Sequence, residues 1–180
     1  MISDPGESKG IQAAALDACV LFQGKLTNLL LHLAEAKAFE PIWSEQIHVE
    51  WRGNLATSMG IPSDRIEYRR AEMEKAFPAA NVLAAPVVSS TIQAKYKTAA
   101  QRKDAHIVAT AVKARAALIV THNIKDFAQS VLKYYHLSKI RPDPFCVDLL
   151  ENRQSEVVAG IRAHRLSLKR TPMSPQEYLD

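Results

Sequence analysis

The sequence predicts an α/β fold in which helices flank a parallel β-sheet. Several segments repeat apolar residues every three or four positions, which is the period of an amphipathic helix. Between them, residues 117–121 form a short continuous apolar run, typical of a strand buried on both faces. This alternation of helices with short buried strands indicates a layered fold with a parallel sheet. With 180 residues, 47% of them apolar, the chain can bury one sizeable core, so we expect a single domain.

Four helical stripes follow one another along the chain. The second helix is expected to begin near Ser44, and the third to have Ser63 or Asp64 as its cap and to stop at Pro78. The apolar residues of the four stripes are Leu26, Leu29, Leu30 and Leu33; Ile47, Trp51, Leu55 and Met59; Ile66, Met73 and Phe77; and Ile107, Val108, Ala111 and Val112, with two further helical segments around residues 145–150 and 155–168.

The segment before Asp17 has no clear signal. Residues 12–16 read Gln-Ala-Ala-Ala-Leu, which favours a helix by propensity, and only residues 20–22 hint at extended structure. If a first strand is present here, Asp17 follows its end. Ligands of parallel sheets bind beyond the carboxyl ends of the strands, so Asp17 would then lie beside the residues that follow the strand at 117–121.

The domain organisation is expected to be simple. Residues 1–10 are interpreted as a mobile tail, residues 11–150 as the main domain, and residues 151–180 as a helical extension packed on or following that domain. The polar N-terminus lacks the pattern of a secretory signal, and no apolar run is long enough to cross a bilayer. Cys19 and Cys146 belong to no metal-binding pattern, so we expect both to be small core residues of a cytoplasmic protein.

Four acidic residues lie where apolar segments end or on helix faces turned toward the core: Asp17, Glu50, Asp104 and Asp126. A buried ionised carboxylate must be paired or bind a metal, or it becomes neutral. The same motifs contain no neutralising Lys or Arg, so one or two divalent cations held by oxygen ligands are the simplest explanation. Each acid taken alone could instead be a cap or a surface charge. Together they point to metal-assisted phosphoryl chemistry.

The chain contains, in this order, the segments 16–21 (LDACVL), 44–51 (SEQIHVEW), 104–111 (DAHIVATA) and 120–127 (VTHNIKDF). These four segments have the order and context of the PIN-domain motifs, and the chain resembles a VapC-type toxin ribonuclease of a type II toxin–antitoxin system. The C-terminal segment 172–179 is similar to that of a subgroup with a longer helical C-terminus.

The resemblance implies a three-layer α/β/α domain over residues 11–150 and an acidic pocket that binds Mg²⁺ or Mn²⁺. Carried over by position, Asp17, Glu50 and Asp104 are the first three catalytic and metal-binding acids. The fourth metal position stays open. Asn123 matches the place just past the strand, whereas Asp126 matches the Asp before Phe that is common in bacterial members and would also be catalytic.

A basic segment precedes Asp104. Its positive charge could bind the phosphates of an unpaired RNA strand, and its tyrosine could stack on a base. A solvated loop is the alternative interpretation. Thr121 is a further candidate, because it could position a phosphate or a metal-bound water, although it could equally be a plain strand-end residue. The residues expected to contact RNA are Lys95, Tyr96, Lys97, Arg102, Lys103 and Thr121. The net charge of +4 suits a polyanionic partner without requiring one.

The resemblance also implies partners. RNA is the expected substrate, and a cognate antitoxin is expected to block the acidic pocket. Apolar residues of the helices at 26–33, including Leu31, and at 66–77 could line a groove for the tail of that antitoxin. Whether the chain forms a homodimer stays open.

Three other classes of protein fit the sequence less well. A phosphoaspartyl enzyme of the haloacid-dehalogenase type needs a second Asp two residues after the first, where this chain has Cys19. A response-regulator receiver domain needs adjacent acids at the first strand and a later Lys. A catalytically silent PIN-like module that binds RNA or a partner is disfavoured by the retention of Asp17, Glu50 and Asp104.

Overall fold

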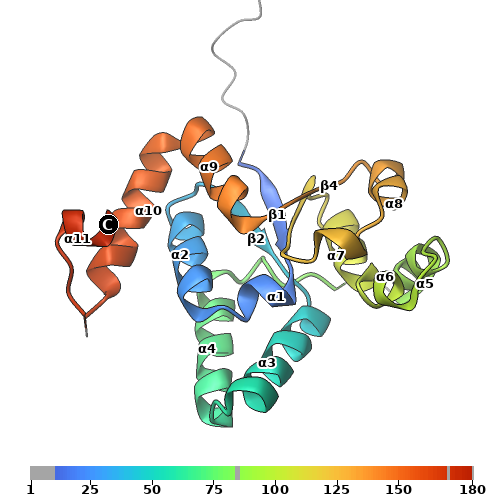
Figure 1. The fold of residues 1–180 in the computed structure, drawn as a ribbon, viewed down its shortest axis with the longest axis horizontal. Helices are drawn as coiled ribbons and strands as arrows, with labels where there is room; N and C mark the ends of the chain where they lie inside the picture. Colours follow the sequence, from blue (N-terminus) through green and yellow to red (C-terminus); the bar gives the residue numbers. More distant parts are fainter. Residues whose placement is uncertain (1–10, 84–85, 170, 180) are drawn as a thin grey trace, which may run out of the picture.

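The sheet at the centre of the molecule is parallel, as the sequence predicts. The computed structural model describes residues 11–83, 86–169 and 171–179; the predicted tail at 1–10 lies outside the described residues. Within the described part of the chain the strand order is β2-β1-β3-β4, and every neighbouring pair is parallel (Figure 1). The strands are β1 (Ala13–Leu16), β2 (Glu40–Ile42), β3 (Leu118–Val120) and β4 (Ser138–Ile140).

The uncertain segment before Asp17 is a strand. Ala14, Ala15 and Leu16 are fully buried, and β1 pairs with β2 on one side and β3 on the other. Tertiary packing therefore overrides the helix propensity of the alanines, because small side chains let neighbouring elements cover both faces of the central strand closely. The short edge strands β2 and β4 have no comparable apolar run and were not predicted.

Helices enclose the sheet. Helix α7 packs against β1 and β3, α2 packs against β2, and α8 packs against β4. The elements within the described residues are α1 (Ala18–Leu21), α2 (Gly24–Glu35), α3 (Glu45–Met59), α4 (Ser63–Ala76), α5 (Pro86–Gln93), α6 (Ala99–Lys103), α7 (Ala105–Lys113), α8 (Gln129–Tyr134), α9 (Pro142–Asn152), α10 (Gln154–Ser167) and α11 (Pro175–Leu179), with the 3₁₀ turn η1 (Ile124–Asp126).

The helix boundaries follow local chemistry. The Ser44 hydroxyl accepts a hydrogen bond from the Ile47 N–H at the start of α3, as predicted, and Gly60 ends that helix with a φ of 60°, in the left-handed region. For α4 the predicted cap is wrong. Pro62 is the N-cap residue, without a side-chain cap, and Ser63 is the first helical residue. The helix ends before Pro78, as expected.

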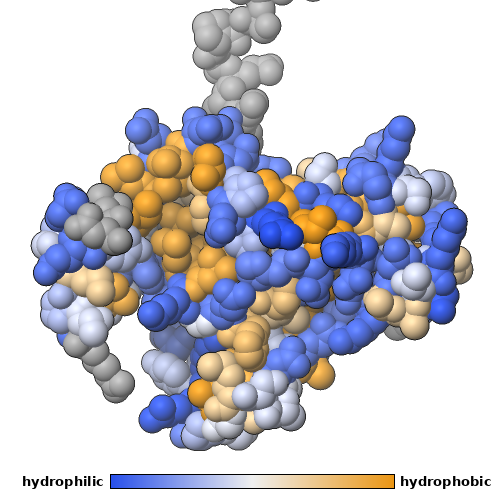
Figure 2. Space-filling view, viewed as in Figure 1, coloured by the Kyte–Doolittle hydropathy of each residue, from blue (hydrophilic) through white to orange (hydrophobic). Residues whose placement is uncertain are grey.

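The C-terminal helices pack on the rest of the domain. Helix α10 lies along α2, and a Cβ added at Gly160 would come within 2.9 Å of the His32 carbonyl oxygen and of Leu33. Glycine therefore allows the two helices to approach closely. At the end of the chain the Tyr178 hydroxyl lies 2.5 Å from Nδ1 of His164. Figure 2 shows apolar surface over α9 and α10, where Val158 is 54% exposed. None of the described helices is long and apolar enough to span a membrane.

Candidate active site

Asp17 and Thr121 meet where two neighbouring strands end. Leu16 of β1 is paired with Val120 of β3, so the next residue of each strand emerges at the same edge of the sheet. Asp17 is 3% exposed, and its Oδ2 accepts a 2.5 Å hydrogen bond from the Thr121 hydroxyl. Asp17 is also the N-cap of α1, accepting from the Cys19 N–H at 3.4 Å. The first predicted acid is therefore held by a strand end, a helix start and a buried hydroxyl.

Cys19 completes the surroundings of Asp17. Its Sγ lies 3.2 Å from Asp17 Oδ2 and accepts a hydrogen bond from the His122 N–H at 3.3 Å. Burial, followed by the charge of Asp17, raises the pKa of the thiol to about 11. The thiol thus stays protonated at neutral pH and donates to the carboxylate. Cys19 and Cys146 are each half-buried and pack against the core, at its edge rather than inside it.

Asp104 lies between α6 and α7 and is 8% exposed. Burial, followed by the negative charges of Asp17, Asp126 and Glu50, raises the pKa of its carboxyl to about 6. The fold thus brings the other three predicted acids within electrostatic reach of Asp104. The four acids come from positions far apart in the sequence: the end of β1, the middle of α3, the start of α7 and the turn η1.

The pKa of Asp104 gives the metal-free protein a pH-dependent stability. The pKa of Asp104 in the folded protein lies above the usual 3.8. The contribution of its protonated carboxyl to the free energy of unfolding is therefore fully present below pH 3.8 and is lost as pH rises through about 6. We therefore expect Asp104→Asn to stabilise the metal-free protein at pH 7.5 by about 1–3 kcal/mol. Urea unfolding in EDTA at pH 7.5 and pH 4.5 measures this. Glu151→Gln, at an exposed acid on α9, is the control, and a gain equal at both pH values would contradict the prediction.

Glu50 is oriented by a histidine. His106 Nε2 lies 3.5 Å from Glu50 Oε2, while His106 Nδ1 is 2.9 Å from the Lys103 carbonyl oxygen. The carbonyl can only accept, so Nδ1 carries a proton. Burial lowers the pKa of His106, but the contact with Glu50 outweighs it, and the net shift is upward. The pKa of His106 beside the second predicted acid is therefore higher than that of an ordinary histidine.

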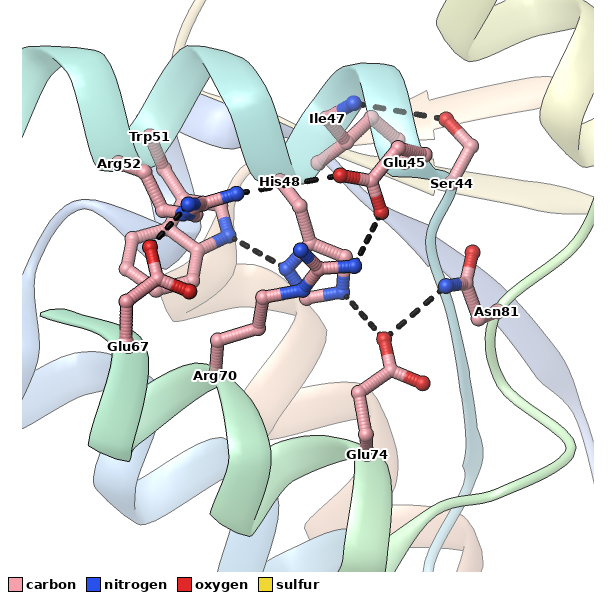
Figure 3. Close-up of polar contacts among 10 residues, drawn as sticks. All are labelled: Ser44, Glu45, Ile47, His48, Trp51, Arg52, Glu67, Arg70, Glu74 and Asn81. Atoms are coloured by element: carbon pink, nitrogen blue, oxygen red, sulfur yellow. Dashed lines mark hydrogen bonds and ion pairs between the residues drawn. The ribbon is translucent and has the colours of Figure 1, made fainter.

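A buried polar network fixes the helix that carries Glu50 (Figure 3). Trp51 Nε1 donates a 3.0 Å hydrogen bond to His48 Nδ1, and His48 Nε2 lies 2.9 Å from Glu74 on α4. Burial, followed by the charge of Arg70, lowers the pKa of His48 to about 4. His48 is thus neutral at pH 7, with its proton on Nε2 facing Glu74. Further ion pairs join α3 to α4: Arg70 with Glu45, and Arg52 with Glu67.

The two candidates for the fourth metal position differ in placement. Asp126 is half-buried in η1, and its charge acts on Asp104. Asn123 is exposed, and its backbone N–H donates a 2.9 Å hydrogen bond to the Thr121 hydroxyl. Asp126 is thus the better placed of the two relative to the other acids.

The donor chemistry of the site suits a hard divalent cation. Asp17, Glu50, Asp104 and Asp126 offer carboxylate oxygens only, and the repulsion that raises the pKa of Asp104 is what a cation would relieve. Within residues 11–83, 86–169 and 171–179, however, no three Asp, Glu, His or Cys side chains converge closely enough to form a ready-made metal site.

The basic segment is more ordered than a loop. It consists of a turn followed by α6, whose N-terminus has a capping box between Thr98 and Gln101. The Arg102 guanidinium lies 3.3 Å from the carbonyl oxygens of Tyr96 and Lys97, and so it holds the turn. The cationic residues Lys95, Lys97, Arg102 and Lys103 are exposed.

Two of the predicted RNA contacts need correction. Tyr96 is only 4% exposed, so its ring belongs to the core and cannot offer a face to a base. Thr121 is fully buried, and its hydroxyl is used by Asp17. The structure therefore assigns Thr121 to the support of a carboxylate rather than to direct contact with a phosphate.

Comparison with known proteins identifies the family. The PIN domain model matches residues 13–125, which contain β1, α3, α7 and β3. The chain belongs to the PIN domain family. A second model, the VapC50 C-terminal domain, matches residues 142–180, where α9, α10 and α11 follow the PIN domain. The predicted family is thus confirmed.

One relative of this PIN domain protein is "Putative ribonuclease VapC50" of Mycobacterium tuberculosis (strain ATCC 25618 / H37Rv). The two sequences are 36% identical over 78 residues, which is 43% of this chain and 46% of the relative. The match therefore spans less than half of the relative's length. No solved structure matches the chain.

Proposed function

We propose that this protein is a metal-dependent endoribonuclease that hydrolyses RNA phosphodiester bonds and acts in the cytoplasm as the toxin of a toxin–antitoxin pair. The observation that supports the proposal is the buried carboxyl of Asp104, on which the charges of Asp17, Asp126 and Glu50 all act. Family membership and the name of the relative support a nuclease.

A bound Mg²⁺ or Mn²⁺ would activate a water molecule and offset charge on the scissile phosphate. Asp17, Glu50, Asp104 and Asp126 would hold the ion, with Asn123 as a further candidate. The surrounding residues orient these ligands: the Thr121 hydroxyl and the Cys19 thiol hold Asp17, and His106 holds Glu50. Such support is typical of metal sites, where outer contacts fix the direction of each ligand.

The proposal is tested by cleavage of a labelled single-stranded RNA. We expect EDTA to abolish cleavage and added Mg²⁺ or Mn²⁺ to restore it, because four carboxylates without a cation repel both one another and the RNA backbone. Single-stranded DNA of the same sequence is the control for substrate class. Cleavage that persists in EDTA would argue against metal dependence.

A catalytically silent PIN domain that binds RNA or a partner is the alternative. A silent domain would bind RNA but release no products at any concentration of Mg²⁺ or Mn²⁺. The same assay therefore separates the two functions.

We further propose that Lys95, Lys97 and Lys103 hold the RNA backbone, with Arg102 keeping their turn in shape. All three lysines are exposed, and they lie just before Asp104. Changing them to Gln should weaken RNA binding and reduce the salt slope by about 0.7 per lost phosphate contact. Changing Lys25, Lys113 and Lys133, also exposed but on α2, α7 and α8, is the control. A triple Gln variant with the parental salt slope would show that this segment does not contact RNA.

The antitoxin is proposed to dock between α2 and α4. These helices border a cavity of about 450 Å³, lined by apolar residues such as Leu31, Tyr68 and Phe77 together with Arg69 and Glu72. This is the pair of helices that the sequence indicated as a groove. A tail lying there could reach the acid site with a cationic side chain, which would compete with the metal.

A further inference from the structure

A second cavity adjoins the acid site. It has a volume of about 350 Å³ and is lined by Cys19, Phe22, Gln23, Asn54, Ser58 and His122. Cys19 belongs to both places, because it lines the cavity while its thiol donates to Asp17. On α3, Asn54 lies four residues after Glu50, and Ser58 lies eight residues after Glu50. All three side chains therefore lie along one face of the helix. The cavity therefore adjoins Asp17 through Cys19 and lies along the face of α3 that carries Glu50.

The lining of this cavity has no fixed charge. Its side chains are an aromatic ring, two amides, a hydroxyl, a thiol and an imidazole. A phosphate would find neither Lys nor Arg there, in contrast to the exposed lysines before Asp104. An uncharged planar group with hydrogen-bonding edges is a better match, because it can stack on Phe22 and satisfy the amides.

The polar groups are arranged for recognition. Gln23 Nε2 lies 3.1 Å from His122 Nε2, so these two side chains hold each other at one wall of the cavity. On the opposite element, α3, the side chains of Asn54 and Ser58 have no hydrogen-bond partner among the residues that the structure describes. Both are exposed and remain available to a ligand.

We propose that this cavity is a base-selecting subsite, which takes the nucleobase of a nucleotide next to the phosphate that the acids attack. The base stacks on Phe22, and its edge bonds with Asn54 and Gln23. The position next to the scissile phosphate rests on the proposed nuclease function, whereas binding of a base does not. Selection would follow from the edge contacts, because a base with the wrong donors and acceptors leaves amide groups unpaired.

The test measures binding rather than cleavage. Labelled pentanucleotides of U, C, A or G are titrated against the full chain carrying Asp104→Asn, which prevents cleavage and leaves the Asp17–Cys19 contact intact. We expect one base to bind most tightly. Phe22→Ala should weaken that complex by about 5- to 150-fold, the range for loss of one stacked base. Asn54→Ala should reduce the difference between the four bases. Gln154→Ala, at an exposed amide on α10, should bind as the parent does.

Phe22 packs partly against the core, so Asn54→Ala, at an exposed position, keeps the test valid if Phe22→Ala does not fold. Equal affinity of the parent for all four bases, or unchanged discrimination in Asn54→Ala, would overturn the subsite. The two proposals fail separately. Base-selective binding by a protein that never cuts RNA would overturn only the nuclease function, while cleavage with base-indifferent binding would overturn only the subsite.

Discussion

Replacing Asp17 or Asp104 by Asn is expected to lower RNA cleavage by orders of magnitude while the protein stays folded. Each change removes a negative charge from a group of four acids that would hold a divalent cation. Asn is nearly isosteric with Asp, and its amide oxygen can still accept the hydrogen bond that Thr121 donates to Asp17. The loss should therefore lie in metal binding and catalysis and not in the fold.

The measurement is single-turnover cleavage of a labelled RNA at saturating Mg²⁺, with circular dichroism and thermal unfolding of each variant. Asp143→Asn, at an exposed acid in the first turn of α9, is the matched control and should cut like the parent. A folded Asp17→Asn protein that cuts at the parental rate would refute the assignment of the site.

The fold could be predicted where burial leaves a pattern in the sequence. Residues 118–120 are buried on both faces and therefore read as a continuous apolar run. Strand β1 consists mainly of alanine, whose local preference is helical, so the sequence left it uncertain and only its place between two other strands makes it extended. Strands β2 and β4 are three residues long and lie at the edges, where few positions need to be apolar.

The grouping of the other acids around Asp104 could be predicted, because each acid follows a strand or lies on a helix face turned toward the core; their role in catalysis stays a prediction. The residues that support these acids could not be predicted. The roles of Cys19 and Thr121 depend on the register between β1 and β3, which no local pattern encodes. The prediction that Tyr96 contacts RNA failed for a related reason. Its basic neighbours suggest an exposed surface, but its own ring is buried in the core. Side-chain direction in an irregular turn is set by tertiary packing.

Expression of this chain alone in bacteria is expected to arrest growth, and expression of Asp17→Asn is not. An uninhibited ribonuclease degrades cellular RNA continuously, so even modest activity is amplified over a cell cycle. Co-expression of a small protein encoded beside this chain's gene should restore growth, and the two proteins should co-purify. Harmless expression of a chain that cuts RNA in vitro would argue against a toxin role and in favour of a housekeeping nuclease.

The rescue also tests where the proposed antitoxin docks. Tyr68 lines the cavity between α2 and α4 and is 69% exposed, so Tyr68→Ala should leave the fold and the growth arrest unchanged. It should nevertheless weaken rescue, because an aromatic residue at the rim of a groove is a typical anchor for a bound tail. Val158→Ala, at a 54% exposed apolar residue on α10, is the control and should be rescued fully. If Tyr68→Ala is rescued and co-purifies normally, the antitoxin docks elsewhere on the domain. If co-expression restores growth for the parent and for Val158→Ala but not for Tyr68→Ala, the antitoxin docks in this groove.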